Sequence, residues 1–328
     1  MLSVAEAIPE LQRSLQAALS WVNPTFTRPL VQPLLASNIP FYWRTALHLL
    51  HQDQTRADTV FEWALTQPDP DLQRIALNAV GDIGVMDLLP RCLSLLQSTD
   101  DDVRFLAARA CVLLGERSQG LRVLKGFAAT TCGQQQAALF LLTAVLPVSE
   151  AQQFLVDLAK HGCDARLLIR LAGELGGPAQ IPALLRLMHN PLLSRLAGHA
   201  FCNIVGLDLV ESNMESSPPP NLNTGPNDDP EDAETASDPD EVLPWPDVKK
   251  VHDWWNQHGS AFDPQRRYLG GIEITRYSCL EILHRGNYGQ RHAAALHLKA
   301  DDPASALFQL HTPAWRQQRR IAMLQSSL

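Results

Sequence analysis

The sequence predicts an all-α protein, a solenoid of stacked helix–turn–helix repeats with a period of about 30–31 residues. Two observations predict this fold class. The segment 71–84 returns 31 positions later as 102–115, and a fixed period of this length is typical of repeat proteins. Apolar residues also recur every three or four positions along most of the chain, which is the spacing of one helix face. One helix pair cannot bury its apolar faces alone, so stacked neighbours must form the core.

The sequence of residues 1–41 predicts a helical cap at the N-terminal end of the array. Apolar side chains share one helix face over 3–20, which predicts a helix there, and four prolines follow in 21–40. A terminal unit has no neighbour on its outer side. We therefore expect that side to be polar.

Residues 42–210 predict about five repeats. The register of the opening pair continues through the helix ends Gly115, Leu146, Gly176 and Gly206. Glycine is favoured directly after a helix because it adopts left-handed backbone angles without strain. Leu146 is the exception, and there Pro147 ends the helix instead. Within each repeat, a turn containing proline or aspartate begins the first helix, and a second helix follows the helix end.

Residues 211–241 predict a disordered acidic linker. This segment contains six prolines and ten acidic residues, no basic residue and almost no large apolar side chain. Such a composition cannot bury enough surface to offset the entropy lost on ordering. An alternative interpretation is that the acidic segment attracts a basic partner.

Residues 242–328 predict a last helical repeat preceded by a tryptophan-rich insertion. Three of the seven tryptophans fall within eleven residues, at Trp245, Trp254 and Trp255. Helical spacing resumes over 275–284 and 288–299. Two interpretations of the tryptophans stay open. They either seal the exposed end of the solenoid or anchor a partner protein.

Two resemblances add to this picture. The units 68–99 and 100–130, with the wording DDDVRFLAARACVLLG, resemble HEAT-like repeats of the kind also seen in phycobilin lyases. The later order LPWPD, VHDWW, RYLGG, GQRHAAALHL and TPAWRQ resembles a bacterial HEAT-repeat family of unassigned activity, whose genes are associated with type VI secretion loci. This second resemblance covers nearly the whole chain except the linker. It implies an accessory role as an effector-binding adaptor or as an immunity protein, and it implies no catalytic residue.

The function predicted from these patterns is a non-catalytic protein-binding scaffold in the cytoplasm. Tryptophan, tyrosine and arginine are the usual energetic centres of protein interfaces. The residues predicted to bind a protein partner are Trp245, Trp254, Trp255, Arg267, Tyr268, Arg291, Trp315 and Arg316.

Motifs for catalysis, cofactors and metals are absent from the sequence. Among the eleven histidines there is no HExxH and none of the His-Glu pairs that bind di-iron in HEAT-repeat deoxyhypusine hydroxylases. The sequence also lacks GxSxG, GxGxxG and GxxxxGK[ST]. The six cysteines form no CxxC pair, and we expect reduced core cysteines. We therefore predict no catalytic residue, no cofactor and no metal.

Two rival functions remain, a bilin-lyase-like enzyme and a nucleic-acid-processing HEAT-repeat enzyme. Residues 242–328 contain eleven basic and seven acidic residues, which would suit phosphate contacts. The net charge of the chain is −8, however, so we expect no nucleic-acid partner. No apolar run of 18 residues and no basic, apolar leader are present, and we expect neither membrane insertion nor export.

Overall fold

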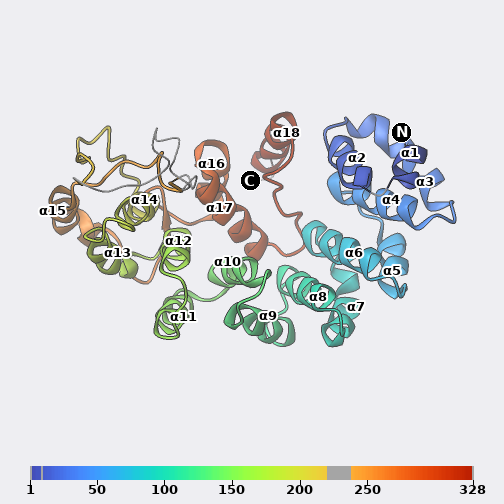
Figure 1. Cartoon of the computed structure of the whole chain (residues 1–328), viewed down its shortest axis with the longest axis horizontal. Coiled ribbons are helices and arrows are strands. Elements are labelled where there is room, and N and C mark those ends of the chain that lie inside the picture. Colours follow the sequence, from blue (N-terminus) through green and yellow to red (C-terminus); the bar gives the residue numbers. More distant parts are fainter. Residues whose placement is uncertain (1, 9, 220–237, 327–328) are drawn as a thin grey trace, which may run out of the picture. The chain divides into compact units, whose positions relative to one another are not determined.

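The computed structural model of the chain describes residues 2–8, 10–219 and 238–326. In this part of the chain, the secondary structure consists of helices and one two-stranded hairpin (Figure 1). The predicted fold class, an all-α solenoid of helix pairs, is confirmed.

The chain divides into two compact units. Unit 1 comprises residues 1–145 and 295–328, and unit 2 comprises residues 146–294. This division differs from the domain boundaries that the sequence predicts at 41, 210 and 241. Residues 295–328 pack with the first helices of the chain because their backbone hydrogen-bonds to them. The Leu307 amide, for example, donates to the Asp82 carbonyl at 2.7 Å.

Unit 1 is a stack of antiparallel helices in which α5 packs on α6, and both α7 and α9 pack on α8 (Figure 1). Its α-helices are α1 Leu2–Ala7, α2 Glu10–Ser20, α3 Pro24–Leu35, α4 Pro40–Gln52, α5 Asp58–Thr66, α6 Pro70–Ile83, α7 Leu89–Ser94, α8 Asp101–Leu113, α9 Gln119–Ala129, α10 Gln135–Val145, α18 Ala314–Gln325 and the last part of α17 Tyr288–Asp301. Two short 3-10 helices, η1 Met86–Leu88 and η2 Leu95–Gln97, flank α7.

Unit 2 has the same construction over α12 and α14, followed by the tryptophan-rich segment. Its elements are α11 Val148–Lys160, α12 Ala165–Leu175, η3 Pro178–Gln180, α13 Ile181–Leu187, α14 Ser194–Val205, α15 Val248–His258, η4 Gly259–Ala261, β1 Tyr268–Leu269, β2 Ile272–Glu273, α16 Arg276–Arg285 and the first part of α17. The strands pair antiparallel, with Leu269 opposite Ile272. The predicted helices over 275–284 and 288–299 are confirmed.

Local sequence signals begin and end the repeat helices. The Asp69 carboxylate accepts a hydrogen bond from the Asp71 amide at 2.8 Å, and Pro70 occupies the first turn of α6. The Asp100 carboxylate accepts from the Val103 amide at 2.9 Å at the start of α8. The glycines predicted at helix ends have left-handed backbone angles: Gly84, Gly115, Gly176 and Gly206.

Small residues bring neighbouring first helices close together. Ala76 and Ala79 on α6 and Ala107 on α8 are fully buried. A Cβ added at Gly81 would lie 2.9 Å from the Ala110 Cα. The backbones of α6 and α8 therefore approach to a distance that larger side chains would prevent.

Both units cover their glycine helix ends with a segment that returns from later in the chain. In unit 1, a Cβ at Gly84 would lie 2.5 Å from the Ala304 carbonyl oxygen. In unit 2, a Cβ at Gly176 would overlap the Tyr268 carbonyl. The repeat glycines thus leave room for a crossing backbone in addition to ending their helices.

The predicted linker 211–241 is only partly described, and its centre, 220–237, lies outside the described residues. The prediction of an unpacked segment is wrong for its flanks. Glu215 forms an antiparallel bridge with Pro246, and Asp240 is 4% exposed and pairs with Arg166 at 2.5 Å. The flank 238–241 packs because Asp238 and Asp240 pair with arginines of α14 and α12. The flank 211–219 packs through backbone hydrogen bonds, since the Ser216 amide donates to Trp245 and the Asp247 amide donates to Met214.

Two expectations for residues 1–41 are also corrected. The single helix expected over 3–20 is two helices, α1 and α2, since a proline separates them in the sequence and removes an N–H donor. The outer side of α3 is not polar. Phe26 is 72% exposed and Leu30 37% exposed, because α3 carries apolar residues on two faces and buries only one of them.

Candidate functional site

Arg267 and Tyr268, both predicted to bind a partner, are buried in unit 2. The Arg267 guanidinium donates to the Leu146 carbonyl oxygen at 2.5 Å, and burial lowers the pKa of Arg267 to about 10. The Tyr268 amide donates to the Gly176 carbonyl oxygen at 2.8 Å, and its hydroxyl accepts from the Asp263 amide at 3.0 Å. Both residues hold the hairpin against helix ends and leave little surface for a partner.

Trp245 and Trp254 are half-buried and pack within unit 2. The Arg195 guanidinium lies 4.6 Å from the centre of the Trp245 ring, a cation–π contact. The Trp254 ring meets Phe201 edge-on at 5.9 Å and stacks on His258 at 4.5 Å. These contacts favour the structural interpretation of both tryptophans.

The remaining arginines also have internal partners. Arg291 Nε donates to the Leu283 carbonyl at 2.9 Å and so ties α17 to α16. In unit 1, Arg316 donates to the Val22 carbonyl at 2.7 Å and pairs with Asp53 at 3.4 Å. Trp315, next to it, is 40% exposed. Of the eight predicted residues, two belong to unit 1 and six to unit 2.

Trp255 differs from the others because it lines an open groove between α13 and α15 in unit 2. The α13–α15 groove has a volume of about 660 Å³. Each helix contributes one stripe at helical spacing. The lining residues are Pro182, Leu185, Arg186 and His189 on the α13 side, and Val248, Lys249, His252, Trp255 and Asn256 on α15.

Contacts with the rest of unit 2 fix α15 in place. The Asp247 carboxylate accepts from the Lys250 amide at 3.1 Å and begins the helix. Pro246 lies against Gly198 of α14, where an added Cβ would be 3.2 Å away. One turn into the helix, Val251 is fully buried. The Trp255 ring then rests against Phe262, with ring centres 5.7 Å apart.

The charge of the groove is positive. Its lining contains Arg186, Lys249 and two histidines, and no carboxylate. Lys249 forms an exposed ion pair with Asp253 at 2.6 Å, and its hydrogen bond to that carboxylate raises the pKa of Lys249. Arg186 is exposed, and its guanidinium has no hydrogen-bond or ion-pair partner within residues 2–8, 10–219 and 238–326.

The residues predicted from the sequence include only the α15 side of this groove, through Trp255. Arg186 and His189 were not singled out, although 182, 185, 186 and 189 follow one helix face. That spacing is equally typical of a buried face, and periodicity alone does not distinguish the two. The signal that was available was the pair of basic groups at the end of α13.

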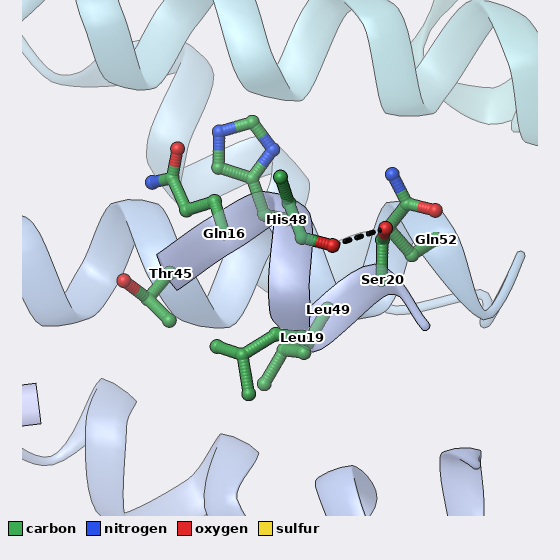
Figure 2. Close-up of a pocket in the computed structure, with 8 residues that line it drawn as sticks. Gln16, Leu19, Ser20, Thr45, His48, Leu49 and Gln52 are labelled. Atoms are coloured by element: carbon green, nitrogen blue, oxygen red, sulfur yellow. Dashed lines mark hydrogen bonds between the residues drawn. The ribbon is translucent and has the colours of Figure 1, made fainter. Parts of the chain in front are cut away.

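Two smaller pockets carry less functional chemistry. One of about 210 Å³ lies between α2 and α4 in unit 1, where Figure 2 shows Gln16 and His48 on one side and Leu19 and Leu49 on the other. Burial, and the nearby His51, lower the pKa of His48 to about 4, so this imidazole is neutral. No carboxylate lines this pocket to act with the imidazole.

The other small pocket, of about 260 Å³, lies between α12, α14 and the segment 239–243 of unit 2. Glu174, which lines it, is engaged by His292 at 3.0 Å. The Asn203 side chain accepts from Asn287 at 2.7 Å. These polar groups are therefore already partnered within the fold.

The described residues contain no group of three or more histidine, cysteine, aspartate or glutamate side chains that could hold a metal ion. The six cysteines are free thiols. Burial raises the pKa of Cys92 and of Cys202 to about 12, so neither is a reactive thiolate at neutral pH. No helix in this part of the chain is long and apolar enough to span a membrane.

Comparison with known proteins identifies the repeats. Residues 57–142, which run from the end of the α4–α5 turn into α10, match the family model of HEAT repeats. No curated protein and no solved structure matches the chain. HEAT repeats commonly serve as scaffolds for protein interactions.

Proposed function

We propose that the protein is a non-catalytic scaffold that binds another protein through the α13–α15 groove. The observation that carries this proposal is the groove itself, with Trp255 and the exposed Arg186 on opposite walls. Tryptophan and arginine are the residue types that most often dominate binding energy at interfaces. Both walls are helices anchored in a packed unit, which keeps the site preorganised.

The finer proposal is a cytoplasmic accessory protein of a bacterial type VI secretion system. Its support is the resemblance of the order LPWPD, VHDWW, RYLGG, GQRHAAALHL and TPAWRQ to a HEAT-repeat family associated with such loci. Within that system the protein would act as an effector-binding adaptor or as an immunity protein.

Some of the basic side chains that a nucleic-acid-processing enzyme would use are engaged within the fold. Nucleic-acid binding would need free basic side chains in residues 242–328. Arg267 is buried, Arg316 pairs with Asp53, and Arg266 pairs with Glu273.

Copurification tests the scaffold function. The tagged full-length chain is captured from its native host after mild crosslinking, and its partners are identified by mass spectrometry. One protein recovered in stoichiometric amount, and lost when the α13–α15 groove is altered, supports the proposal. Recovery of nucleic acid or of a chromophore in place of a protein would overturn it.

Deletion of the gene tests the type VI role and separates its two forms. A strain lacking an adaptor fails to deliver one effector but survives contact with its siblings. A strain lacking an immunity protein is killed by siblings that carry the effector. Unchanged delivery together with unchanged survival contradicts both forms.

A further inference from the structure

We propose that the occupant of the α13–α15 groove is an acidic segment of the partner protein, in which carboxylates flank an apolar or aromatic side chain. This inference rests on the proposed scaffold function and names the chemistry of what that scaffold binds. It is carried by the lining of the groove, which combines an apolar base with basic groups on both walls.

The apolar part of the groove accepts a side chain. Leu185 on α13 is 7% exposed, and Trp255 on α15 is half-buried against Phe262. Val248 and Pro182 complete this base. An aliphatic or aromatic side chain placed there would be removed from water on both sides, and Trp255 would supply a flat face for ring packing.

The basic groups are distributed over both walls. On one wall, Arg186 extends from α13 and His189 from the turn that follows it; on the other, Lys249 and His252 extend from α15. If a carboxylate lies on each side of a central apolar residue, one carboxylate would contact the α13 wall and the other would contact the α15 wall. Arg186 is suited to this task because its planar guanidinium can bind both oxygens of one carboxylate.

The ion pair of Lys249 does not block such binding. The Lys249 and Asp253 side chains are 85% and 48% exposed, and exposed ion pairs contribute little to stability. A ligand carboxylate can therefore replace Asp253 at small cost. Unit 2 already uses the same chemistry internally, since Arg195 and Arg166 hold the segment 238–241 through Asp238 and Asp240.

The dimensions and charge favour a peptide over a nucleic acid. A volume of about 660 Å³ is that of a pocket for one or two large side chains. A nucleic acid requires basic contacts to successive phosphates along an extended track. The chain as a whole has a net charge of −8, which would repel a long polyanion.

Fluorescence anisotropy with the full-length chain tests the inference. The probe is a short fluorescein-labelled peptide of aspartate, glutamate, leucine and phenylalanine. We expect saturable binding that weakens as salt rises. Replacing its acids by asparagine and glutamine, or its apolar residues by serine, should each weaken binding roughly tenfold, the usual effect of losing a charge-assisted contact or a buried side chain.

Arg186→Glu should weaken probe binding by at least about tenfold. Arg122→Glu is the matched control, because Arg122 is an exposed residue of α9 and the change in net charge is the same. Equal losses in the two variants would show attraction by overall charge alone and overturn the inference. Single-stranded DNA that competes as well as the unlabelled peptide would overturn it too.

The two proposals can fail separately. If Arg186→Glu abolishes probe binding but the variant still copurifies with the same partner, the groove is not the partner site. The inference is then wrong, and of the proposed function only the scaffold role, without the groove, stands. If the chain binds the probe in the expected way but has no protein partner in its host, the scaffold function is wrong and the groove chemistry stands.

Discussion

Arg267 donates a hydrogen bond to the carbonyl oxygen of Leu146, which lies 121 positions earlier and occupies the one helix end in the repeat register that has no glycine. At Gly176, the next helix end, a crossing backbone at Tyr268 covers the helix carbonyls. At Leu146 the donor to the helix carbonyl is the Arg267 side chain instead of a crossing backbone. The loss of glycine and the buried arginine are therefore two parts of one structural solution.

Replacing Arg267 tests this relationship. We expect Arg267→Ala to lower the free energy of unfolding by about 2–4 kcal/mol, because the Leu146 carbonyl loses its donor and a cavity forms. Arg266→Ala is the control, since the neighbouring Arg266 is exposed and its partners are Glu273 and Asp263. Chemical denaturation followed by circular dichroism measures both. Equal effects of the two substitutions would contradict a structural role specific to Arg267.

Two glycines with positive φ angles allow the energetic cost of backbone strain to be separated from the cost of steric overlap. Gly176 and Gly162 both have positive φ angles, 71° and 78°, and both lie in unit 2. A Cβ at Gly176 would overlap the Tyr268 carbonyl, whereas nothing lies within 4 Å of a Cβ at Gly162. We expect Gly162→Ala to cost about 1 kcal/mol from strain alone. Gly176→Ala should cost at least about 3 kcal/mol, since the hairpin must also move.

Thermal and chemical unfolding of the two variants provides the measurement. A cost at Gly176 no larger than that at Gly162 would mean that the hairpin does not rest on this helix end. Loss of protection from hydrogen exchange at the Tyr268 amide in Gly176→Ala would locate the damage directly, because that amide donates to the Gly176 carbonyl.

Replacing each of two helical glycines by alanine should change the stability of the protein in opposite directions. Gly81 of α6 and Gly126 of α9 both lie inside helices, where alanine is intrinsically favoured by about 1 kcal/mol. Nothing lies within 4 Å of a Cβ at Gly126, so Gly126→Ala should stabilise the protein by about that amount. A Cβ at Gly81 would lie 2.9 Å from the Ala110 Cα, so Gly81→Ala should destabilise it. A stabilising Gly81→Ala, measured by the same unfolding assay, would contradict the close packing of α6 on α8.

The sequence predicted the repeat helices well because their signals are local. Asp69 with Pro70 begins α6, and Gly84 ends it, as the pattern indicated. What crosses those helix ends could not be predicted in the same way. Contacts such as that of Gly84 with Ala304 join positions far apart in the chain. The type of either residue does not predict which residue the other one is.

Prediction of the site succeeded less well, for a physical reason. Tryptophan, tyrosine and arginine are typical of protein interfaces, but the same large side chains also hold folds together. Arg267 and Tyr268 serve the fold, and only Trp255 among the eight lines the groove. The sequence does not distinguish Arg186, because basic residues are common on helices and only the three-dimensional neighbours of this one mark it as part of a groove.

The burial of Lys299 in unit 1 should make the stability of the protein depend on pH. Its side chain is 1% exposed, and its ammonium donates to the Pro303 and Ser305 carbonyls at 2.7 Å each. Burial lowers the pKa of Lys299 to about 8. Asp82 and Asp302 oppose this shift and Arg109 adds to it, but desolvation is the largest cause.

The sign follows from the difference between folded and unfolded pKa values. Between pH 8 and about 10.4 the unfolded chain keeps a proton on Lys299 that the folded chain has released, so the free energy of unfolding rises with pH. Lys299→Met removes this titration. We expect the stability of the natural chain relative to Lys299→Met to increase by about 1–2 kcal/mol from pH 7.5 to 9.5. Urea unfolding of both proteins at the two pH values measures the change, and a difference independent of pH would show that Lys299 keeps its charge in the folded chain.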